Sequence, residues 1–437
     1  MSATLTNTGF NQDSFEAFLA ARDEPDWLTE ARTTAWARFC ELALPSGREE
    51  EWMRTDIRLF KLDRFSLPSE LPEISSPDAL LATGVELGGK GTSVDSRGVE
   101  SQLEDCWASR GVLFGSLDAM LAEHSDRLRP YFERQLVDPY QDKFSALNAA
   151  CWSGGSLLFV PKGVQVDQPL HTLAVMSDGG VDLNRTLVIL EEGAEATLLS
   201  ESASTDLHGG GMHCGAIELI VEANARLRYV NLQNWGDGVW HFAHQMAHVA
   251  ANAGIQWTIG ALGSRLAKVN QHVALTGMDA EAQVNGAMFT QGKQHLSYNT
   301  HQHHQAAHCR SDLLYKAALQ DDSRTVWRGM IKVDKDAQQT DAYQRNDNLM
   351  LAASARSDSI PGLEIEADDV RCTHGSTSGR VDDQQMFYAM TRGYTRKEAT
   401  RMIVTGFFQQ VFDRITIDSV RDALGEAIGR RVRDIEE

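Results

Sequence analysis

Four turns of similar composition recur at nearly constant spacing in the middle of the chain. They contain Gly193, Asn224, Asn252 and Asp279, which lie 31, 28 and 27 residues apart. Short runs of β-forming residues alternate with these turns, and no helical pattern separates them. A repeat of this length without helices predicts a β-solenoid. In that fold each turn of chain stacks on the one before it, and the backbone hydrogen bonds run between successive turns.

The segments between the turns support this prediction. Aliphatic and β-branched residues are concentrated at 157–160, 186–190, 216–221, 227–232 and 255–259. The chain has no proline between positions 170 and 360. A long stack of ladders requires such an absence, because every backbone amide must be able to donate a hydrogen bond. A β-sandwich is the alternative for a series of short strands, and the repeat favours the solenoid.

The N-terminal part has a different pattern. Asp26 precedes an amphipathic run that predicts a helix, and a break follows at Pro45. Another helix is expected over 115–136. Residues 62–100 are rich in Pro, Ser and Gly, which is typical of irregular connections.

Helical patterns return at the C-terminus. Asp382 with Gln385, and Thr395 with Glu398, have the spacing of capping boxes. The helix that follows Thr395 has an apolar face formed by Val404, Phe408, Val411 and Ile415. A further helix after Asp418 has a second apolar stripe, which either packs on the solenoid end or docks a partner. This second stripe consists of Val420, Leu424, Ile428 and Val432. The expected domains are an N-terminal helical region (1–140), a β-helix core (141–378) and a C-terminal helical region that docks a partner (379–437).

Composition and charge exclude several classes of function. The chain has 61 acidic and 41 basic residues, a net charge of −20, which opposes binding to nucleic acid or to anionic lipid. The sequence contains no CxxC pair, which argues for reduced thiols rather than a zinc ribbon or a disulfide framework. The beginning of the sequence lacks the pattern of a secretion signal, and no apolar run reaches about 18 residues. We therefore expect a cytoplasmic protein. The six cysteines are Cys40, Cys106, Cys151, Cys214, Cys309 and Cys372.

The densest group of metal-ligand side chains lies between positions 301 and 309. On a strand, His301 and His303 share one face and His304 points away. A zinc-dependent hydrolase that uses this group is one hypothesis, and a polar strand facing solvent or another subunit is the simpler one. The chain has neither the GxxxxGK[ST] frame of a phosphate loop nor a GxSxG elbow. These observations favour a protein that is not an enzyme. The group consists of His301, His303, His304, His308 and Cys309.

A second pair of candidate ligands lies near the end of the solenoid. Cys372 and His374 are two residues apart on a segment that predicts a strand, so both side chains point to the same side. Together they could hold iron or a persulfide. A buried thiol beside a structural imidazole is the alternative.

The stretch around this pair closely resembles one protein family. Residues 363–377, LEIEADDVRCTHGST, and the helices that follow them are similar to the SufB/SufD family of the SUF iron–sulfur cluster assembly system. PSGREEEWMRTD (45–56), FVPKGV (159–164) and DAQQTDAYQ (336–344) resemble further elements of that family. The SufD members are the more similar, because Asn346 stands where SufB members have a sulfur-accepting cysteine. One feature, Gln233-Asn234-Trp235, is more similar to the SufB members.

The resemblance implies a specific set of properties. The fold would be a right-handed parallel β-helix between helical ends. The chain would be a non-catalytic scaffold subunit that pairs with a SufB-like subunit through the solenoid and binds a SufC-like ATPase through its C-terminal region; the isolated chain could form a homodimer. A transient iron–sulfur cluster would be shared with the partner, with His374 and Cys372 as this chain's ligands. A SufB-type sulfur-accepting subunit is the main alternative.

Overall fold

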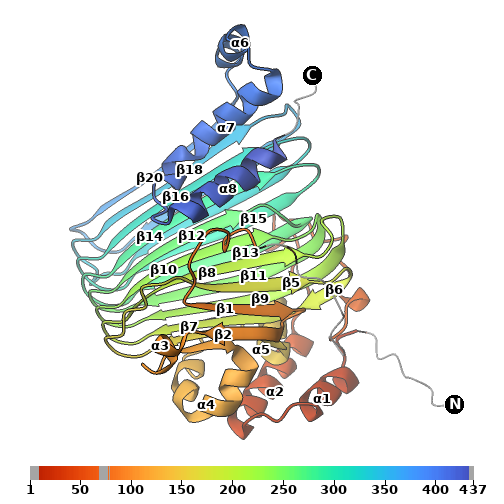
Figure 1. The fold of residues 1–437 in the computed structure, drawn as a ribbon, viewed down its shortest axis with the longest axis vertical. Helices are drawn as coiled ribbons and strands as arrows, with labels where there is room; N and C mark the ends of the chain where they lie inside the picture. The colour runs from red at the N-terminus through yellow and green to blue at the C-terminus, as the bar shows by residue number, and fades with distance from the viewer. Residues whose placement is uncertain (1–8, 68–76, 78, 433–437) are drawn as a thin grey trace, which may run out of the picture.

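Two long sheets face one another along most of the chain and form a parallel β-solenoid of about eight turns, which covers 154–380 (Figure 1). The structure is a computed structural model, and it describes residues 9–67, 77 and 79–432. From residue 184 to residue 380, strands consecutive in the sequence alternate between the two sheets, so each sheet pairs every second strand in parallel. The prediction of a solenoid rather than a sandwich is confirmed.

Each sheet has a continuous order from one end of the molecule to the other. The first sheet runs β2 (Arg97–Leu103), β1 (Gly89–Val94), β5 (Leu170–Met176), β8 (Glu195–Ser204), β10 (Arg226–Asn234), β12 (Gly254–Ala261), β14 (Glu281–Thr290), β16 (Arg310–Leu319), β18 (Asp341–Met350) and β20 (Arg371–Arg380). The second runs β19 (Arg356–Ile365), β17 (Arg324–Val333), β15 (His295–His304), β13 (Leu266–Leu275), β11 (Gly238–Val249), β9 (Gly210–Val221), β7 (Asn184–Leu190), β4 (Gly154–Val160) and β3 (Leu113–Ser116), and β6 (Gly180–Asp182) also pairs with β9. The first strands differ from the later ones, because β2 pairs with β1 and β3 pairs with β4 in antiparallel.

The repeated turns are stacked at one corner of the solenoid. Gly193, Asn224, Asn252 and Asp279 all have positive φ angles, of 70°, 61°, 54° and 60°. This left-handed conformation suits glycine and is tolerated best by Asn and Asp among the other residues. The Asn224 amide donates to the Ala251 carbonyl at 2.9 Å, so the hydrogen-bond ladder continues through the turns. The regular spacing in the sequence therefore corresponds to one full turn of the solenoid.

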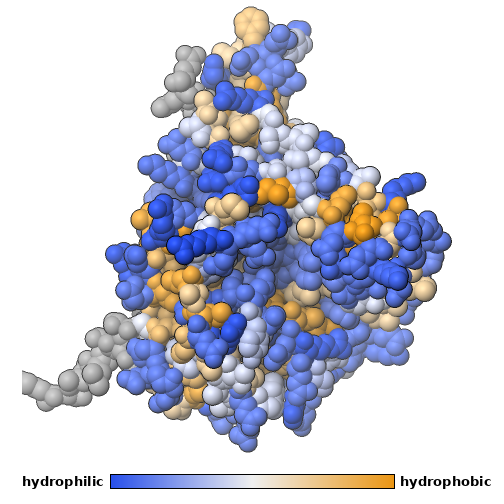
Figure 2. Space-filling model, turned by 180° about the vertical axis from the view of Figure 1, so that it is seen from behind, coloured by the Kyte–Doolittle hydropathy of each residue, from blue (hydrophilic) through white to orange (hydrophobic). Residues whose placement is uncertain are grey.

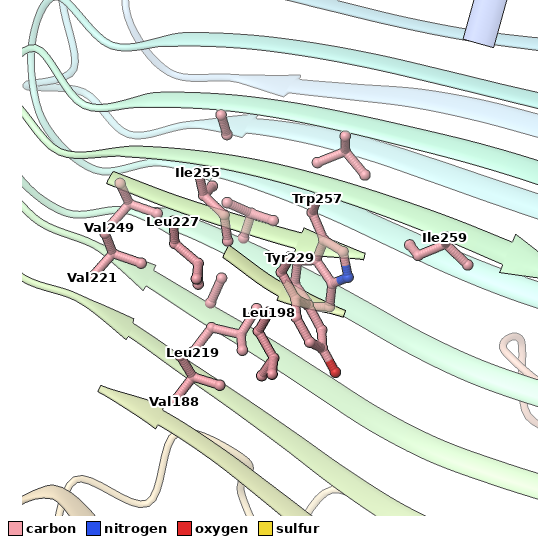
Figure 3. Packing of buried hydrophobic residues seen from close by; sticks show 14 of the residues in the cluster. Val188, Leu198, Leu219, Val221, Leu227, Tyr229, Val249, Ile255, Trp257 and Ile259 are labelled. Atoms are coloured by element: carbon pink, nitrogen blue, oxygen red, sulfur yellow. The ribbon is translucent and has the colours of Figure 1, made fainter. Parts of the chain in front are cut away.

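The interior is filled by side chains that stack in register from one strand to the next. Leu227 lies opposite Ile255, and Tyr229 lies opposite Trp257. All four are at most 3% exposed, and Figure 3 shows them within one continuous cluster between the sheets. Because strand residues alternate between the two faces, every second residue contributes to this core. A shift of one residue in the pairing would turn these large apolar side chains to the outer face, so their burial fixes the register of the strands.

The N-terminal region covers the outer face of the second sheet and extends the first. Phe144 stacks on Phe242 of β11 with ring centroids 3.7 Å apart. The expectation of irregular connections over 62–100 was wrong in part, because β1 and β2 form a hairpin there and β1 pairs in parallel with β5; residues 68–76 and 78 lie outside the described part. Gly89 and Gly98 suit this hairpin because a Cβ at either position would collide with a neighbouring strand, at the Gln102 carbonyl and at Ser116 respectively. The helical elements are α1 (Gln12–Ala20), α2 (Asp26–Glu41), the short 3₁₀ turn η1 (Leu62–Arg64), α3 (Asp105–Ala108), α4 (Leu117–Phe132) and α5 (Lys143–Cys151).

The C-terminal region comprises α6 (Asp383–Thr391), α7 (Arg396–Phe412) and α8 (Asp418–Arg431). In Figure 1, α7 and α8 lie across the outer face of the first sheet and α6 projects beyond its end. The capping box of Thr395 and Glu398 is confirmed. Asp382 caps α6 through the Gln384 amide, so the box expected with Gln385 does not form.

The apolar stripe of α7 faces the sheet. Val404, Phe408 and Val411 are fully buried and Ile415 is 4% exposed, all within one cluster with Leu232 and other outward-facing residues of the first sheet. The opposite face of the molecule is largely hydrophilic, with separate apolar patches (Figure 2). None of the described helices is long and apolar enough to cross a membrane.

Candidate functional site

The last turn of the solenoid differs from all earlier turns in its exposure. β20 ends the first sheet and β19 ends the second, so each pairs with a neighbouring strand on one side only. No residue of either strand is buried, whereas β16 and β17 are mostly buried. Edge strands of this kind present unpaired backbone N–H and C=O groups to any chain that can add a further strand. Pro361 lies on β19, in keeping with the tolerance of edge strands for proline.

Cys372 and His374 face the interior at this open end. On β18, Ala342 and Gln344 point inward and are buried, and they pair in register with Cys372 and His374. Both candidate side chains therefore continue inward-facing columns and lie on one side of β20, as the strand spacing predicted. The Cys372 side chain packs against the apolar cluster that contains Ile331, while His374 is exposed.

The second sheet contributes the other half of this open end. Ser359 of β19 and Ser376 of β20 are hydrogen-bonded through their hydroxyl groups at 2.8 Å. Leu363 and Ile365, which continue the inward columns of β17, are 37% and 39% exposed. The end of the solenoid therefore presents hydroxyl groups at its centre and apolar side chains at one corner, where Cys372 lies.

The electrostatic surroundings determine the state of the thiol. Burial raises the pKa of Cys372, and the negative charge of Asp341 raises it further. The thiol is therefore protonated at neutral pH until a metal ion or another electrophile displaces the proton. Among the described residues, no three His, Cys, Asp or Glu side chains are arranged to hold a metal ion. A cluster bound at Cys372 and His374 would need ligands from outside this chain.

Asn346 lies on β18, the last strand but one of the first sheet. Its side chain is 1% exposed and donates to the Tyr315 carbonyl at 3.4 Å. It also accepts a hydrogen bond from Asn348 at 2.7 Å. The carboxamide of Asn346 therefore links β18 to Tyr315 on the neighbouring strand β16. It has no nucleophilic atom that could accept sulfur.

The histidine-rich segment is divided among different environments. His301 and His303 lie on the outer face of β15 and His304 points inward, where its Nε2 is hydrogen-bonded to Ser311 at 2.8 Å. His308 occupies a positive-φ turn and Cys309 is fully buried in the core. The hypothesis of a zinc hydrolase built from these five residues is contradicted, because alternation along the strand separates their side chains. Burial lowers the pKa of His301 to about 4 and of His304 to about 3.

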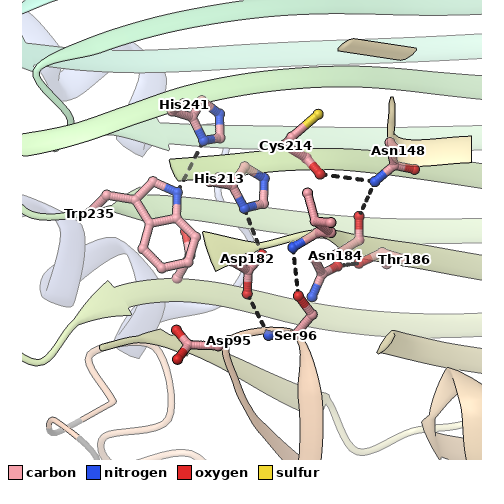
Figure 4. Close-up of polar contacts among 12 residues, drawn as sticks. Asp95, Ser96, Asn148, Asp182, Asn184, Thr186, His213, Cys214, Trp235 and His241 are labelled. Atoms are coloured by element: carbon pink, nitrogen blue, oxygen red, sulfur yellow. Dashed lines mark hydrogen bonds and ion pairs between the residues drawn. The ribbon is translucent and has the colours of Figure 1, made fainter. Parts of the chain in front are cut away.

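One polar network was not predicted from the sequence. Inside the first turns, Asp182 is hydrogen-bonded to His213 at 2.8 Å, and His213 stacks on His241 with ring centroids 4.6 Å apart. Trp235 donates to His241 at 3.0 Å, and the Ser96 amide of the β1–β2 turn donates to Asp182 at 2.9 Å (Figure 4). The network therefore joins the N-terminal hairpin to the solenoid. Its only signal in the sequence is the separation of 31 residues between Asp182 and His213, which equals one turn of the repeat.

These observations define a parallel β-solenoid protein with helical ends and an exposed last turn that holds a cysteine and a histidine on one side of its edge strand. The SUF system FeS cluster assembly, SufBD core domain matches residues 173–407, and the SufBD protein N-terminal region matches residues 90–172. The chain belongs to the SufBD family, and its role is in iron–sulfur cluster assembly by the SUF system.

Curated relatives of similar length support this assignment. The iron–sulfur cluster assembly SufBD family protein of Staphylococcus saprophyticus is 28% identical over 423 residues, which cover 94% of this chain and 90% of that protein. The corresponding proteins of Staphylococcus haemolyticus and Staphylococcus aureus are 26% and 27% identical over the same share of each chain. The descriptions of these relatives do not distinguish SufB from SufD.

Proposed function

We propose that this chain is a SufD-type, non-catalytic scaffold subunit of a cytoplasmic SUF complex. It pairs with a SufB-like subunit through the last turn of the solenoid and contributes to a transient iron–sulfur cluster at that interface. The observation that carries the proposal is the exposed last turn, where Cys372 and His374 lie on the inward-facing side of β20, a strand with one unpaired edge. Two ligands from one chain suit a labile cluster that is completed by a partner and later released.

The SufD type is favoured over the SufB type by position 346. A sulfur-accepting subunit needs a thiol, and Asn346 supplies a buried, hydrogen-bonded carboxamide instead. The stretch Gln233-Asn234-Trp235, which is more similar to SufB members, has structural contacts that account for it. Gln233 is hydrogen-bonded to both backbone groups of Gly263, and Trp235 donates to His241.

The surface for the SufC-like ATPase is proposed to be α6 and the beginning of α7. Phe387 and Tyr388 on α6 are 70% and 60% exposed, and Tyr394 and Met402 are about half exposed, at 47% and 48%. Aromatic and methionine side chains clustered on a projecting element are typical of interface anchors. In this proposal the three expected domains have separate roles. Residues 1–140 cap the solenoid, residues 141–378 form the core that bears the cluster, and residues 379–437 dock the ATPase.

Anaerobic reconstitution of the complete complex tests the proposal. The chain is co-purified with a SufB-like subunit and a SufC-like ATPase, supplied with ferrous iron and sulfide, and followed by cluster absorbance. We expect His374→Ala to lose most of the absorbance while subunit stoichiometry and melting temperature stay unchanged. Cys372→Ser should cause a smaller loss if His374 alone binds, and an equal loss if both bind.

Thr373→Ala is the matched control, because Thr373 lies between the two candidates on β20 and points to the opposite side. Its complex should assemble a cluster as the wild type does. Full absorbance in the His374→Ala complex would remove His374 from the site. Failure of the chain to co-purify with the SufB-like subunit would overturn the proposed pairing.

A further inference from the structure

A cavity of about 450 Å³ lies on the outer face of the second sheet, away from the last turn of the solenoid. Its floor comes from β11, β13, β15 and β17, and its rim from the N-terminal region through Glu51 and the segment from Leu136 to Gln141. The cavity is large enough to hold a hydrated ion.

Four side chains form a column across the floor of this cavity. Met246, His272, His301 and Met330 lie on four successive strands and pair in register. The rings of His272 and His301 are stacked, with centroids 4.4 Å apart and planes 19° apart. Neighbouring strands fix the separation of the two side chains. Because the rings are stacked, their nitrogen lone pairs run nearly parallel, and the rings must turn toward each other to hold one ion between them. A thioether flanks the imidazole pair on each side.

The two imidazoles have free coordinating atoms. The Nε2 atoms of both His272 and His301 are buried and have no hydrogen-bond partner in the protein. A buried polar atom without a partner is costly, and such an atom needs a ligand or a water molecule. The neighbouring His303 differs: its Nε2 is hydrogen-bonded to Asp334 at 2.9 Å, and its Nδ1 accepts from Gln305 at 3.1 Å.

We propose that His272 and His301 form a two-histidine binding site for a divalent first-row transition-metal ion. Neutral imidazole is the common nitrogen ligand for zinc, iron, nickel and copper, and flanking thioethers suit ions of this softness better than calcium or magnesium. The charged groups at the cavity also fit a cation. Glu51 and Asp138 line it, and the guanidinium of Arg328 is paired with Glu50 at 2.7 Å.

The composition of the site implies exchangeable binding. No third His, Cys, Asp or Glu of the described residues joins the pair in an arrangement that could hold a metal ion. Water would therefore fill the remaining positions, and the ion would be held by few protein ligands and released readily. The site is independent of whether the chain is a SufB-type or a SufD-type subunit, since it uses neither the last turn nor position 346.

Titration of the full-length, metal-free protein with Co²⁺ tests this proposal, because Co²⁺ bound to imidazole has visible absorption and Zn²⁺ can displace it. We expect the wild type to bind one Co²⁺ in competition with Zn²⁺. Affinity should fall at least tenfold in His272→Asn and in His301→Asn, which keep a planar polar side chain. His303→Asn, on the same face of β15, should bind as the wild type does.

Two results would overturn the proposal. One is wild-type affinity in both His272→Asn and His301→Asn, which would mean that water alone occupies the pair. The other is loss of Co²⁺ binding in His374→Ala with no change in the other variants, which would place the ion at the last turn. If an asparagine variant unfolds, electron paramagnetic resonance of the Cu²⁺-loaded wild type decides: couplings from two imidazole nitrogens support the site, and their absence contradicts it.

Discussion

His304 is a single buried side chain that makes the stability of the folded solenoid depend on pH. It is 0% exposed, its Nε2 is hydrogen-bonded to Ser311, and burial lowers its pKa to about 3. In the unfolded chain a histidine has a pKa of about 6.5. Between those two values the unfolded state binds a proton that the folded state does not, so stability falls as the pH falls from about 6.5 toward 3.

Replacement of this histidine should reduce the acid sensitivity of the protein. For His304→Gln we expect the loss of unfolding free energy between pH 7 and pH 4 to be smaller than in the wild type by roughly 1–3 kcal/mol. Urea unfolding at several pH values measures it. Identical slopes for His304→Gln and the wild type would contradict the assignment.

Local residue patterns were sufficient to predict which neighbouring side chains share a face. The opposite orientation of His301 and His304, and the common side of Cys372 and His374, follow from strand alternation alone. Contacts between turns were not accessible in this way. Asp182 and His213 are hydrogen-bonded across 31 residues, and two histidines 29 positions apart, His272 and His301, stack only because the register of β13 and β15 aligns them.

At the scale of elements, the backbone turns with positive φ angles are stacked at one corner and mark the point where the chain passes from one sheet to the other. Asn224 has a φ of 61° and an exposed side chain, and its amide donates to the carbonyl of Ala251. We expect Asn224→Ala to lower the free energy of unfolding by about 1 kcal/mol, because a Cβ without the local polar contacts of Asn disfavours this conformation. Asn224→Gly should be within about 0.5 kcal/mol of the wild type. Chemical denaturation distinguishes the two variants, and equal stability of the Ala and Gly variants would be the contrary result.

The C-terminal helices have a face buried on the first sheet and an exposed face that we propose for docking. The combined change Phe387→Ala and Tyr388→Ala should weaken binding of the SufC-like ATPase at least tenfold with no change in melting temperature, since both side chains are mainly exposed. Phe408→Ala should instead destabilise the chain by about 3–5 kcal/mol, because Phe408 is fully buried on the sheet. Calorimetric titration and thermal unfolding give the two readouts. Full-strength ATPase binding by the α6 double variant would locate docking elsewhere.

The same helices show what a sequence pattern leaves open. The stripe of Val404 and Phe408 predicted an amphipathic helix correctly, but a helical period gives only the existence of an apolar face and not the surface that covers it. The β1–β2 hairpin was missed for a different reason. Its glycine-rich sequence has weak strand propensity, and its conformation depends on pairing with β5, far along the chain.

At the scale of the whole molecule, the stack is closed at one end and open at the other. The N-terminal hairpin and α4 cover the first turns, where Ser96 and Asp182 are buried. At the other end, β19 and β20 have unpaired edges and the apolar side chains Leu363 and Ile365 are more than a third exposed. An open solenoid end of this kind is prone to pair with another sheet unless charges or a cap prevent it. Assembly with a partner would satisfy both the backbone groups and the apolar surface.

A charge introduced at this end should therefore prevent assembly without unfolding the chain. In Leu363→Lys the ammonium group can remain in water in the free subunit, but pairing would bury it beside Cys372 and the apolar corner. Because desolvating an unpaired charge costs several kcal/mol, affinity for a SufB-like partner should fall roughly 100-fold or more. Any homodimer of the isolated chain that uses this end should dissociate as well. Analytical ultracentrifugation of the chain alone and of the mixed subunits measures both effects.

The matched control is Leu207→Lys, which changes a leucine that is 61% exposed on a loop before β9. It introduces the same charge at a distance from the last turn and should leave assembly unchanged. Thermal unfolding of the two free variants should agree with the wild type to within a few degrees, because neither leucine is buried in the free subunit. If Leu363→Lys pairs with the partner as tightly as Leu207→Lys does, the subunits meet on another surface, and the exposed edges of β19 and β20 need a different explanation.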